Sequence, residues 1–152
     1  MNKSKENIQN LQLCLNFIKK NKIKEAEKLL FSLVEDKELK VEALVYLGVC
    51  KIKTNKKKEA IEFITKALKI SSNHEFANLN LGLIYFDNKN YQSSIKYLNK
   101  AYLINSRNII AIYHLGLINL LLKNLEEAEK YFNKVIELNN NDQNALLNLG
   151  II

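Results

Sequence analysis

The sequence predicts an all-α protein made of stacked copies of one helix-turn-helix unit. The chain has 152 residues and four glycines, Gly48, Gly82, Gly116 and Gly150, each 34 residues after the one before. A fixed period of roughly 20 to 50 residues is typical of repeat proteins. The chain also lacks proline, which favours long uninterrupted helices. Both observations predict a helical solenoid.

A period of 34 residues divides the chain into four complete units and one partial unit. Their bounds are 7–40, 41–74, 75–108 and 109–142, followed by 143–152. In the third unit we expect a first helix from Phe76 to Phe86, a break at 87–90, and a second helix from Tyr91 to Ile104. The fourth unit repeats this pattern, with its second helix from Leu125 to Leu138. We expect Asn90 and Asn124 to take left-handed turn conformations, and residues 1–152 to form a single domain.

Small residues recur at two positions of the unit. Position eight holds Cys14, Gly48, Gly82 and Gly116, and position twenty holds Ala26, Ala60, Ser94 and Ala128. A glycine inside a helix costs about 1 kcal/mol relative to alanine, so its recurrence needs a compensating contact. We expect the two helices of a unit to approach closely, with the residue at position twenty against the one at position eight. The surrounding bulk comes from the leucines at position seven (Leu13, Leu47, Leu81 and Leu115) and from Leu30, Ile64, Leu98 and Phe132 at position twenty-four.

This pattern resembles the tetratricopeptide repeat, in its period, its Leu-Gly pair and the spacing of Ala60, Ile64 and Ala67. The resemblance covers residues 7–152 and implies a right-handed superhelical solenoid that serves as a non-enzymatic protein-interaction scaffold. Some positions depart from the family pattern. Position four lacks the usual aromatic residue. Position eleven, which is usually aromatic, holds Lys51 and Asn119 in two units, and no proline ends the second helix. The RNA-reading pentatricopeptide repeat has a period of 35 residues, which does not fit.

In this family the first helices line a concave groove, and positions two, five, nine and twelve point into it. The residues at these positions are nearly all apolar, so we expect a protein or peptide partner with an apolar or amphipathic segment, and Phe76, Phe86 and Tyr113 are the expected anchor residues of the groove. The predicted groove residues, with two polar ones from position six, are Val49, Ile52, Phe76, Leu79, Asn80, Leu83, Phe86, Ile110, Tyr113, His114, Leu117 and Leu120.

Two alternatives to this groove follow from the same residues. In a short stack these side chains could form core between neighbouring first helices, an interpretation that suits Leu11, Leu15, Val45 and Val49. Phe86, Tyr113 and Leu120 favour the groove. A groove for acidic chain ends would instead need lysine and asparagine where this chain has Leu11 and Leu15, so we exclude that class of ligand.

The formal charge of +7 is concentrated in the first half of the chain. Its densest cluster is Lys51, Lys53, Lys56, Lys57 and Lys58, a candidate surface for nucleic acid or anionic lipid. The chain has a single arginine, Arg107, and no aromatic residues are interleaved with the lysines. We therefore expect a solvated turn and no nucleic-acid partner. Lys51 should direct its ammonium outward from an apolar stem.

Catalysis, cofactors and metals are not expected. Every glycine belongs to the repeat, and the chain contains no nucleophile elbow, metal-binding helix motif or dinucleotide fingerprint. His74 fits a helix start, and His114 is one of the position-six residues that face the groove. Glu126 and Glu127 suit the start of a second helix.

Cys14 and Cys50 fall in apolar helical patterns, so we expect buried free thiols in a reducing compartment. Residues 1–6 lead into no apolar export signal, and no run of 18 apolar residues exists to span a membrane. These features favour a cytoplasmic protein.

The sequence stops midway through a first helix, at Ile152. Repeat arrays usually close with a polar cap. This ending suggests either an N-terminal region of a longer protein or an open face covered by a second copy. Homo-oligomerisation is thus a second candidate function.

Overall fold

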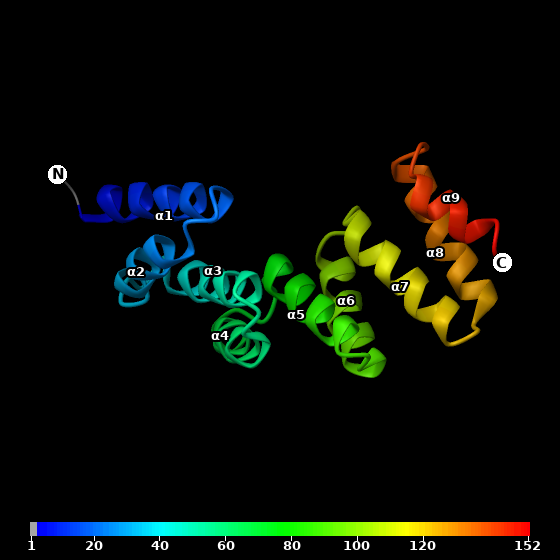
Figure 1. Cartoon of the computed structure of the whole chain (residues 1–152), viewed down its shortest axis with the longest axis horizontal. Helices are drawn as coiled ribbons and strands as arrows, with labels where there is room; N and C mark the ends of the chain where they lie inside the picture. The colour runs from blue at the N-terminus through cyan, green and yellow to red at the C-terminus, as the bar shows by residue number, and fades with distance from the viewer. Residues whose placement is uncertain (1–2) are drawn as a thin grey trace. The chain divides into compact units, whose positions relative to one another are not determined.

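The structure is a computed structural model that describes residues 3–152. Met1 and Asn2, the start of the segment in which no export signal is expected, lie outside the described residues. Within residues 3–152 the chain forms helices and no strands (Figure 1), which confirms the all-α prediction. The helices are α1 (Lys3–Lys19), α2 (Ile23–Leu33), α3 (Lys40–Lys53), α4 (Lys57–Ile70), α5 (Glu75–Asp87), α6 (Tyr91–Ile104), α7 (Ile109–Leu121), α8 (Leu125–Leu138) and α9 (Gln143–Leu149).

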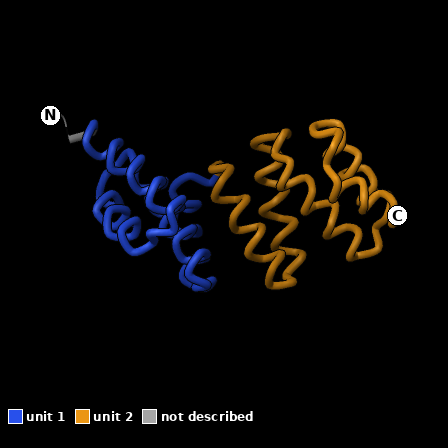
Figure 2. Tube along the Cα trace, turned by 45° about the horizontal axis from the view of Figure 1, so that its top comes forward, with its two compact units in different colours: residues 1–72 blue, residues 73–152 orange. Residues whose placement is uncertain are grey.

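The helices gather into two compact units, residues 1–72 (unit 1) and residues 73–152 (unit 2), shown in Figure 2. In unit 1, α2 packs against α1 and α3, and α4 packs against α3. In unit 2, successive helices from α5 to α9 pack against one another, and α5 also contacts α7. Each unit is therefore a stack of helical hairpins in chain order, as the 34-residue period predicts. A single domain over the whole chain stays a prediction.

The turn inside each hairpin uses a left-handed residue one position earlier than predicted. Positive φ angles occur at Asn21 (56°), Asn55 (59°), Lys89 (58°) and Lys123 (62°). Asn90 and Asn124 have φ near −86° and −85°, so their predicted left-handed conformations are wrong. Asn90 instead caps α6 by accepting a hydrogen bond from the Ser93 N–H at 3.1 Å.

Backbone hydrogen bonds explain this shift. The Asn90 N–H donates to the Tyr85 carbonyl, and the Asn124 N–H donates to the Asn119 carbonyl, each over 2.9 Å. A bond that reaches back five residues closes the end of a helix when the residue just before the donor is left-handed. The turn geometry thus assigns that conformation to Lys89 and Lys123, although neither residue type favours it.

Gly48, Gly82 and Gly116 allow the close helix approach that the sequence predicts, and the nearest side chain is the one at position twenty-four. A Cβ on Gly48 would lie 2.5 Å from Ile64 Cγ1, and one on Gly82 would lie 2.7 Å from Leu98 Cγ. The side chain at position twenty-four therefore fills most of this space, and position twenty also meets position eight, since the Ala60 carbonyl oxygen would lie 3.3 Å from a Cβ on Gly48. In unit 2, Ser94 at position twenty contributes a buried hydrogen bond from its Oγ to the Gly82 carbonyl at 2.8 Å.

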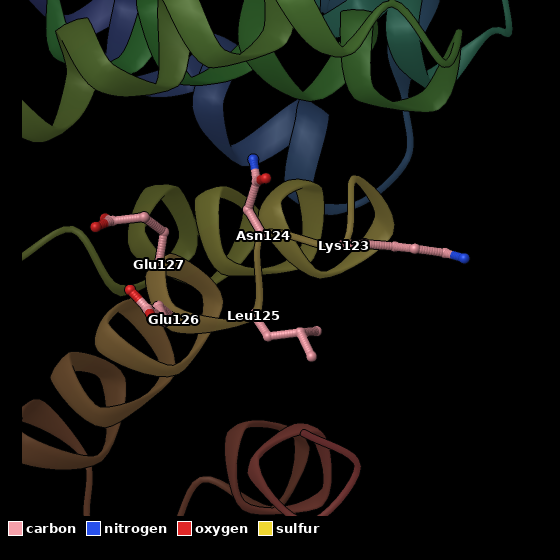
Figure 3. Close-up of a pocket in the computed structure, with 5 residues that line it drawn as sticks. All are labelled: Lys123, Asn124, Leu125, Glu126 and Glu127. Atoms are coloured by element: carbon pink, nitrogen blue, oxygen red, sulfur yellow. The ribbon is translucent and has the colours of Figure 1, made fainter.

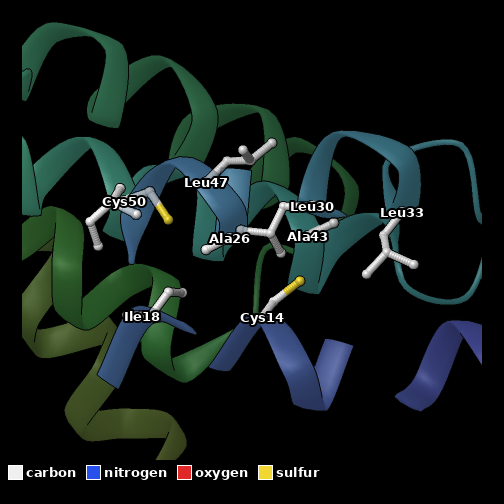
Figure 4. Close-up of a cluster of buried hydrophobic side chains, with 9 residues drawn as sticks. Cys14, Ile18, Ala26, Leu30, Leu33, Ala43, Leu47 and Cys50 are labelled. Atoms are coloured by element: carbon white, nitrogen blue, oxygen red, sulfur yellow. The ribbon is translucent and has the colours of Figure 1, made fainter. Parts of the chain in front are cut away.

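The core of unit 1 lies between α1, α2 and α3 and includes the thiols of both cysteines (Figure 4). Cys14 and Cys50 are free and fully buried, as predicted. Leu47 at position seven is fully buried, whereas Leu13 at the same position is 42% exposed. The prediction that Leu13 supplies core bulk is wrong, because the cluster that α1 shares with α2 and α3 contains Cys14 and Ile18 and leaves the Leu13 side of α1 exposed.

Candidate interaction surface

Most predicted groove residues of unit 2 lie partly exposed along α5 and α7. Phe76 is 39% exposed and Ile110 is 50% exposed. Seven other predicted residues are half-buried; together with Phe76 and Ile110 they form what we call the inner face, namely Phe76, Asn80, Leu83, Phe86, Ile110, Tyr113, His114, Leu117 and Leu120. In unit 1, Val49 and Ile52 on α3 are also half-buried.

Leu79 is a correction to the predicted groove. Its side chain is only 6% exposed and belongs to a core cluster with Leu98, Ala111 and Leu115. Because α7 packs against α5, it covers position five of α5 and leaves position two exposed. Val45 is likewise fully buried, as the core interpretation predicts, whereas Leu11, Leu15 and Val49 are half-buried.

Aromatic contacts join α5 to α7 on the inner face. The rings of Phe86 and His114 meet edge-to-face, with centroids 5.1 Å apart and planes at 89°. His114 makes a second edge-to-face contact with Tyr113 at 5.7 Å. Phe86 also contacts the Tyr91 ring at 6.1 Å. The structure thus brings the predicted anchors Phe86 and Tyr113 into one aromatic cluster around His114.

Polar residues at position six bond to the carbonyl at position two of their own helix. Asn80 Nδ2 donates to the Phe76 carbonyl at 2.7 Å, and Asn148 Nδ2 donates to the Asn144 carbonyl at 2.7 Å. His114 Nδ1 lies 2.8 Å from the Ile110 carbonyl. A carbonyl can only accept, so Nδ1 carries the hydrogen and Nε2 is the acceptor of the neutral ring. These position-six residues, which we call the ladder, therefore each keep one atom that can accept a further hydrogen bond, namely Oδ1 of each asparagine and Nε2 of the histidine.

A cavity of about 140 Å³ lies beside this ladder, where α7 meets the start of α9. It is lined by Ile109, Ile110, Tyr113, His114, Asp142 and Asn144. Asp142 Oδ1 accepts the Ala145 N–H at 3.0 Å and so caps α9. Asn148 Nδ2 donates to the Tyr113 hydroxyl at 3.2 Å, which ties α9 to α7.

The comparison with known families agrees with this architecture. Models of the tetratricopeptide repeat match residues 41–74 and residues 75–141. The chain belongs to the tetratricopeptide repeat family. No curated protein matches it in sequence.

Solved structures share the same fold. The structure of PilF from Pseudomonas aeruginosa superposes with a TM-score of 0.88 at 23% identity, over 99% of this chain and 69% of that one. A structure of MamA gives 0.79 at 22% identity, over 90% of this chain and 80% of that one. A tetratricopeptide repeat protein from Parabacteroides merdae gives 0.79 at 23% identity, and the match spans 57% of its length. The fold is that of a protein-interaction scaffold, and such repeats are typically non-enzymatic.

Within the lysine cluster, the predicted direction of the Lys51 side chain is corrected. The Lys51 ammonium does not point outward to solvent, because it lies 3.0 Å from Glu27 Oε1 on α2 and 3.2 Å from Glu59 Oε2 on α4. Burial lowers the pKa of Lys51, but hydrogen bonds to both carboxylates outweigh it and raise the pKa above its ordinary value. The sequence analysis did not predict this ion pair. Glu27, which faces position eleven of the next repeat, is the residue that could have indicated it.

Hollows beside the hairpin turns belong to the repeat geometry. One of about 470 Å³ is lined by residues 123–127, and one of about 350 Å³ is lined by residues 55–59, two periods earlier. In Figure 3 the Lys123 side chain points away from the carboxylates of Glu126 and Glu127, and Leu125 points in a third direction. These side chains do not converge on a common point, so they form no binding constellation.

The remaining predicted chemistry has simple explanations. His74 caps α5, with its Nδ1 accepting the Ala77 N–H at 3.2 Å, so its predicted place at a helix start is confirmed. Glu126 and Glu127 lie in the first turn of α8, as predicted. Among residues 3–152, no three His, Cys, Asp or Glu side chains form a group suited to a metal ion. No helix in this part of the chain is long and apolar enough to cross a membrane.

Proposed function

We propose that this chain is a non-enzymatic scaffold whose inner face holds an apolar or amphipathic segment of a partner protein. The observation that carries the proposal is the aromatic cluster of Phe86, His114 and Tyr113, which lies on the same two helices as the exposed side chains of Phe76 and Ile110. Aromatic side chains dominate the energetics of protein interfaces. A face that gathers such side chains and leaves them only half-buried is suited to binding.

The degree of burial supports a binding role beyond core packing. A residue needed only for the core would be covered, as Leu79 and Leu115 are. Phe76 and Ile110 share position two of their repeats, and both remain exposed beside half-buried neighbours. A partner that covered them would remove apolar surface from water, worth about 25 cal/mol per Å² before the costs of association.

The ladder of acceptor atoms favours an amphipathic partner over a wholly apolar one. Oδ1 of Asn80 and Nε2 of His114 lie on the same face as the apolar residues, and both accept hydrogen bonds. A buried acceptor left without a donor costs about 1–3 kcal/mol. A segment that covers these atoms therefore needs N–H or O–H donors among its apolar side chains.

The test is affinity capture from cells, comparing the wild type with a Phe76→Ser/Ile110→Ser variant. Both residues are exposed, so the variant should keep the helicity and thermal stability of the wild type. Leu103→Ser is the matched control, because Leu103 is 81% exposed and apolar but lies on the outer helix α6.

The proposal expects partners that the inner-face variant loses and the Leu103→Ser control keeps, at low and high salt. Capture that survives the inner-face variant would overturn it. Capture that both variants lose would indicate general adhesion to exposed apolar surface.

Self-association is the second candidate, favoured by the exposed apolar residues Leu146 (49%) and Ile151 (65%) at the end of unit 2. Sedimentation equilibrium over a hundredfold range of concentration tests it. A mass that rises with concentration, and no longer does so in Leu146→Ser/Ile151→Ser, would support it. A constant monomer mass would exclude it.

A further inference from the structure

The inner helices of unit 2 carry no basic residue, although the chain as a whole is strongly basic. Neither lysine nor arginine occurs in α5, α7 or α9, and the charged residues of these helices are Glu75 and Asp87. The basic residues of unit 2 lie instead on α6, on α8 and in the turns. Because seven basic residues balance seven acidic ones in unit 2, the net charge of +7 belongs entirely to unit 1. The helices α5, α7 and α9 are therefore mostly apolar, and the charged residues that they carry are acidic.

The cavity between α7 and the start of α9 combines a carboxylate with aromatic and aliphatic walls. One Asp142 oxygen caps α9, and the other lies 3.4 Å from Asn139 Nδ2, a long contact that leaves its acceptor capacity largely unused. Its lining also includes the rings of Tyr113 and His114 and the aliphatic side chains of Ile109 and Ile110. At about 140 Å³, the cavity far exceeds the roughly 10–15 Å³ that holds one water.

We propose that the partner segment carries an arginine next to its apolar anchors, and that this arginine enters the cavity. The inference rests on the proposed function and names the side chain that the inner face selects. The guanidinium stacks on the Tyr113 ring, meets the His114 ring edge-on, and donates to the Asp142 carboxylate. Its methylene stem lies against Ile109 and Ile110. The neighbouring apolar side chains of the segment contact Phe76, Leu83 and Phe86.

Arginine fits this cavity better than lysine for two reasons. A guanidinium is planar and delocalised, so it stacks on aromatic faces while its edge donates in a fixed fork. Lysine carries a compact and strongly hydrated charge, which loses more hydration on entering a cavity with apolar walls. An acidic side chain is disfavoured, since the cavity already holds a carboxylate and acceptor atoms.

Selection from a displayed library of random 12-residue peptides tests the inference, because the library samples both arginine and its alternatives beside apolar residues. The library is enriched in parallel on the wild type, on Phe76→Ser/Ile110→Ser and on Asp142→Asn. Asparagine caps a helix about as well as aspartate, so Asp142→Asn removes the charge and keeps α9 capped. Glu129→Gln is the matched control, because it removes the same charge from an exposed site on α8 that does not line the cavity.

The inference expects wild-type binders that combine apolar residues with arginine and that fail on the inner-face variant. On Asp142→Asn the apolar residues should remain enriched and the arginine should not. The best peptide should lose about tenfold in affinity when its arginine is changed to glutamine, and this loss should shrink on Asp142→Asn but not on Glu129→Gln.

Each other outcome identifies the claim that fails. Apolar binders without arginine, or with arginine that Asp142→Asn does not affect, would overturn this inference and leave the proposed function standing. Binders that Phe76→Ser/Ile110→Ser retains, or no binders at all, would count against the proposed function itself.

Discussion

The Lys51 ammonium on α3 lies 3.0 Å from the Glu27 carboxylate on α2, and the Lys51 side chain is 10% exposed. Glu59 on α4 approaches the same ammonium at 3.2 Å. A single lysine thus links three consecutive helices of unit 1, at a repeat position that usually holds an aromatic residue. These ion pairs add a shared charge to the apolar packing between the three helices.

Lys51→Met should destabilise the chain, because it leaves the partly covered Glu27 carboxylate without its counter-charge. We expect a loss of about 1–2 kcal/mol in the free energy of unfolding, less than for a fully buried pair. The measurement is urea denaturation followed by circular dichroism. Lys53→Met, at an exposed neighbour on the same helix, should change the stability by less than about 0.5 kcal/mol. Equal effects of the two substitutions would show that the ion pairs contribute nothing specific.

The same cluster predicts a pH dependence through Glu59. Hydrogen bonds from Lys51, then from Lys56, lower the pKa of this carboxyl below its ordinary value of 4.5. A lowered folded-state pKa stabilises the protein above the ordinary pKa, and this contribution disappears as the pH falls through the lowered value. The wild type should therefore lose more stability than Glu59→Gln between pH 5 and about pH 3. Parallel pH profiles of the thermal midpoint for the two proteins would contradict this assignment.

The Cys50 thiol should be inert in the folded protein. Burial, followed by the nearby charge of Glu27, raises its pKa from 9.0 to about 12. The thiolate fraction at pH 8 is therefore about a thousandfold lower than for an unperturbed thiol. In a Cys14→Ala background, Ellman's reagent should modify Cys50 at least that much more slowly in buffer than in guanidinium. Rapid labelling under native conditions would mean that unit 1 opens readily around α3.

Gly82→Ala should destabilise unit 2, although alanine is the better helix former. The added Cβ would lie 2.7 Å from Leu98 Cγ and 3.1 Å from the Leu98 backbone nitrogen, so rotating the leucine side chain cannot relieve the whole clash. Overpacking of this kind costs about 1–3 kcal/mol, which exceeds the helix propensity gained.

Gly150→Ala is the control for that substitution. Gly150 has φ of −71°, and a Cβ there would meet no atom closer than 3.5 Å. Thermal denaturation should show an unchanged or slightly raised midpoint for Gly150→Ala and a lowered one for Gly82→Ala. A neutral Gly82→Ala would show that the helices of this hairpin can separate without cost.

Lys89→Gly should stabilise the protein by about 0.5–1 kcal/mol, because Lys89 has φ of 58° and glycine adopts this conformation without steric cost. Asn90→Gly, one residue later, should lower the stability, because it removes the side-chain cap of α6. Chemical denaturation of both variants checks the pair. The opposite order would place the left-handed residue where the sequence alone suggested it, at Asn90.

Much of the fold could be predicted because its rules operate within one repeat. The expected second helices from Tyr91 to Ile104 and from Leu125 to Leu138 match α6 and α8 at both ends. Gly48, Gly82 and Gly116 did mark close helix approaches, since those contacts lie within a hairpin. The assignment of Asn90 as left-handed failed, because the turn is set by a backbone hydrogen bond and not by the preference of its residues.

The candidate surface was only partly predictable. Leu79 and Phe76 both lie on the predicted groove side of α5, yet Leu79 is buried and Phe76 is 39% exposed. Nothing in their own positions separates them, because the difference comes from the neighbouring helix α7. The pairing of Lys51 with Glu27 likewise joins two repeats, and a pattern read within one 34-residue repeat cannot predict such pairs.

The sequence by itself determined the repeat length, the helical hairpins, the burial of both cysteines and the sites of close helix contact. These features depend on local backbone geometry and on side-chain size within 34 residues. Only the tertiary structure decided which apolar side chains are core and which are surface, and which charges pair. Burial depends on what the adjacent helix covers, so the same position-seven leucine is buried at Leu47 and exposed at Leu13.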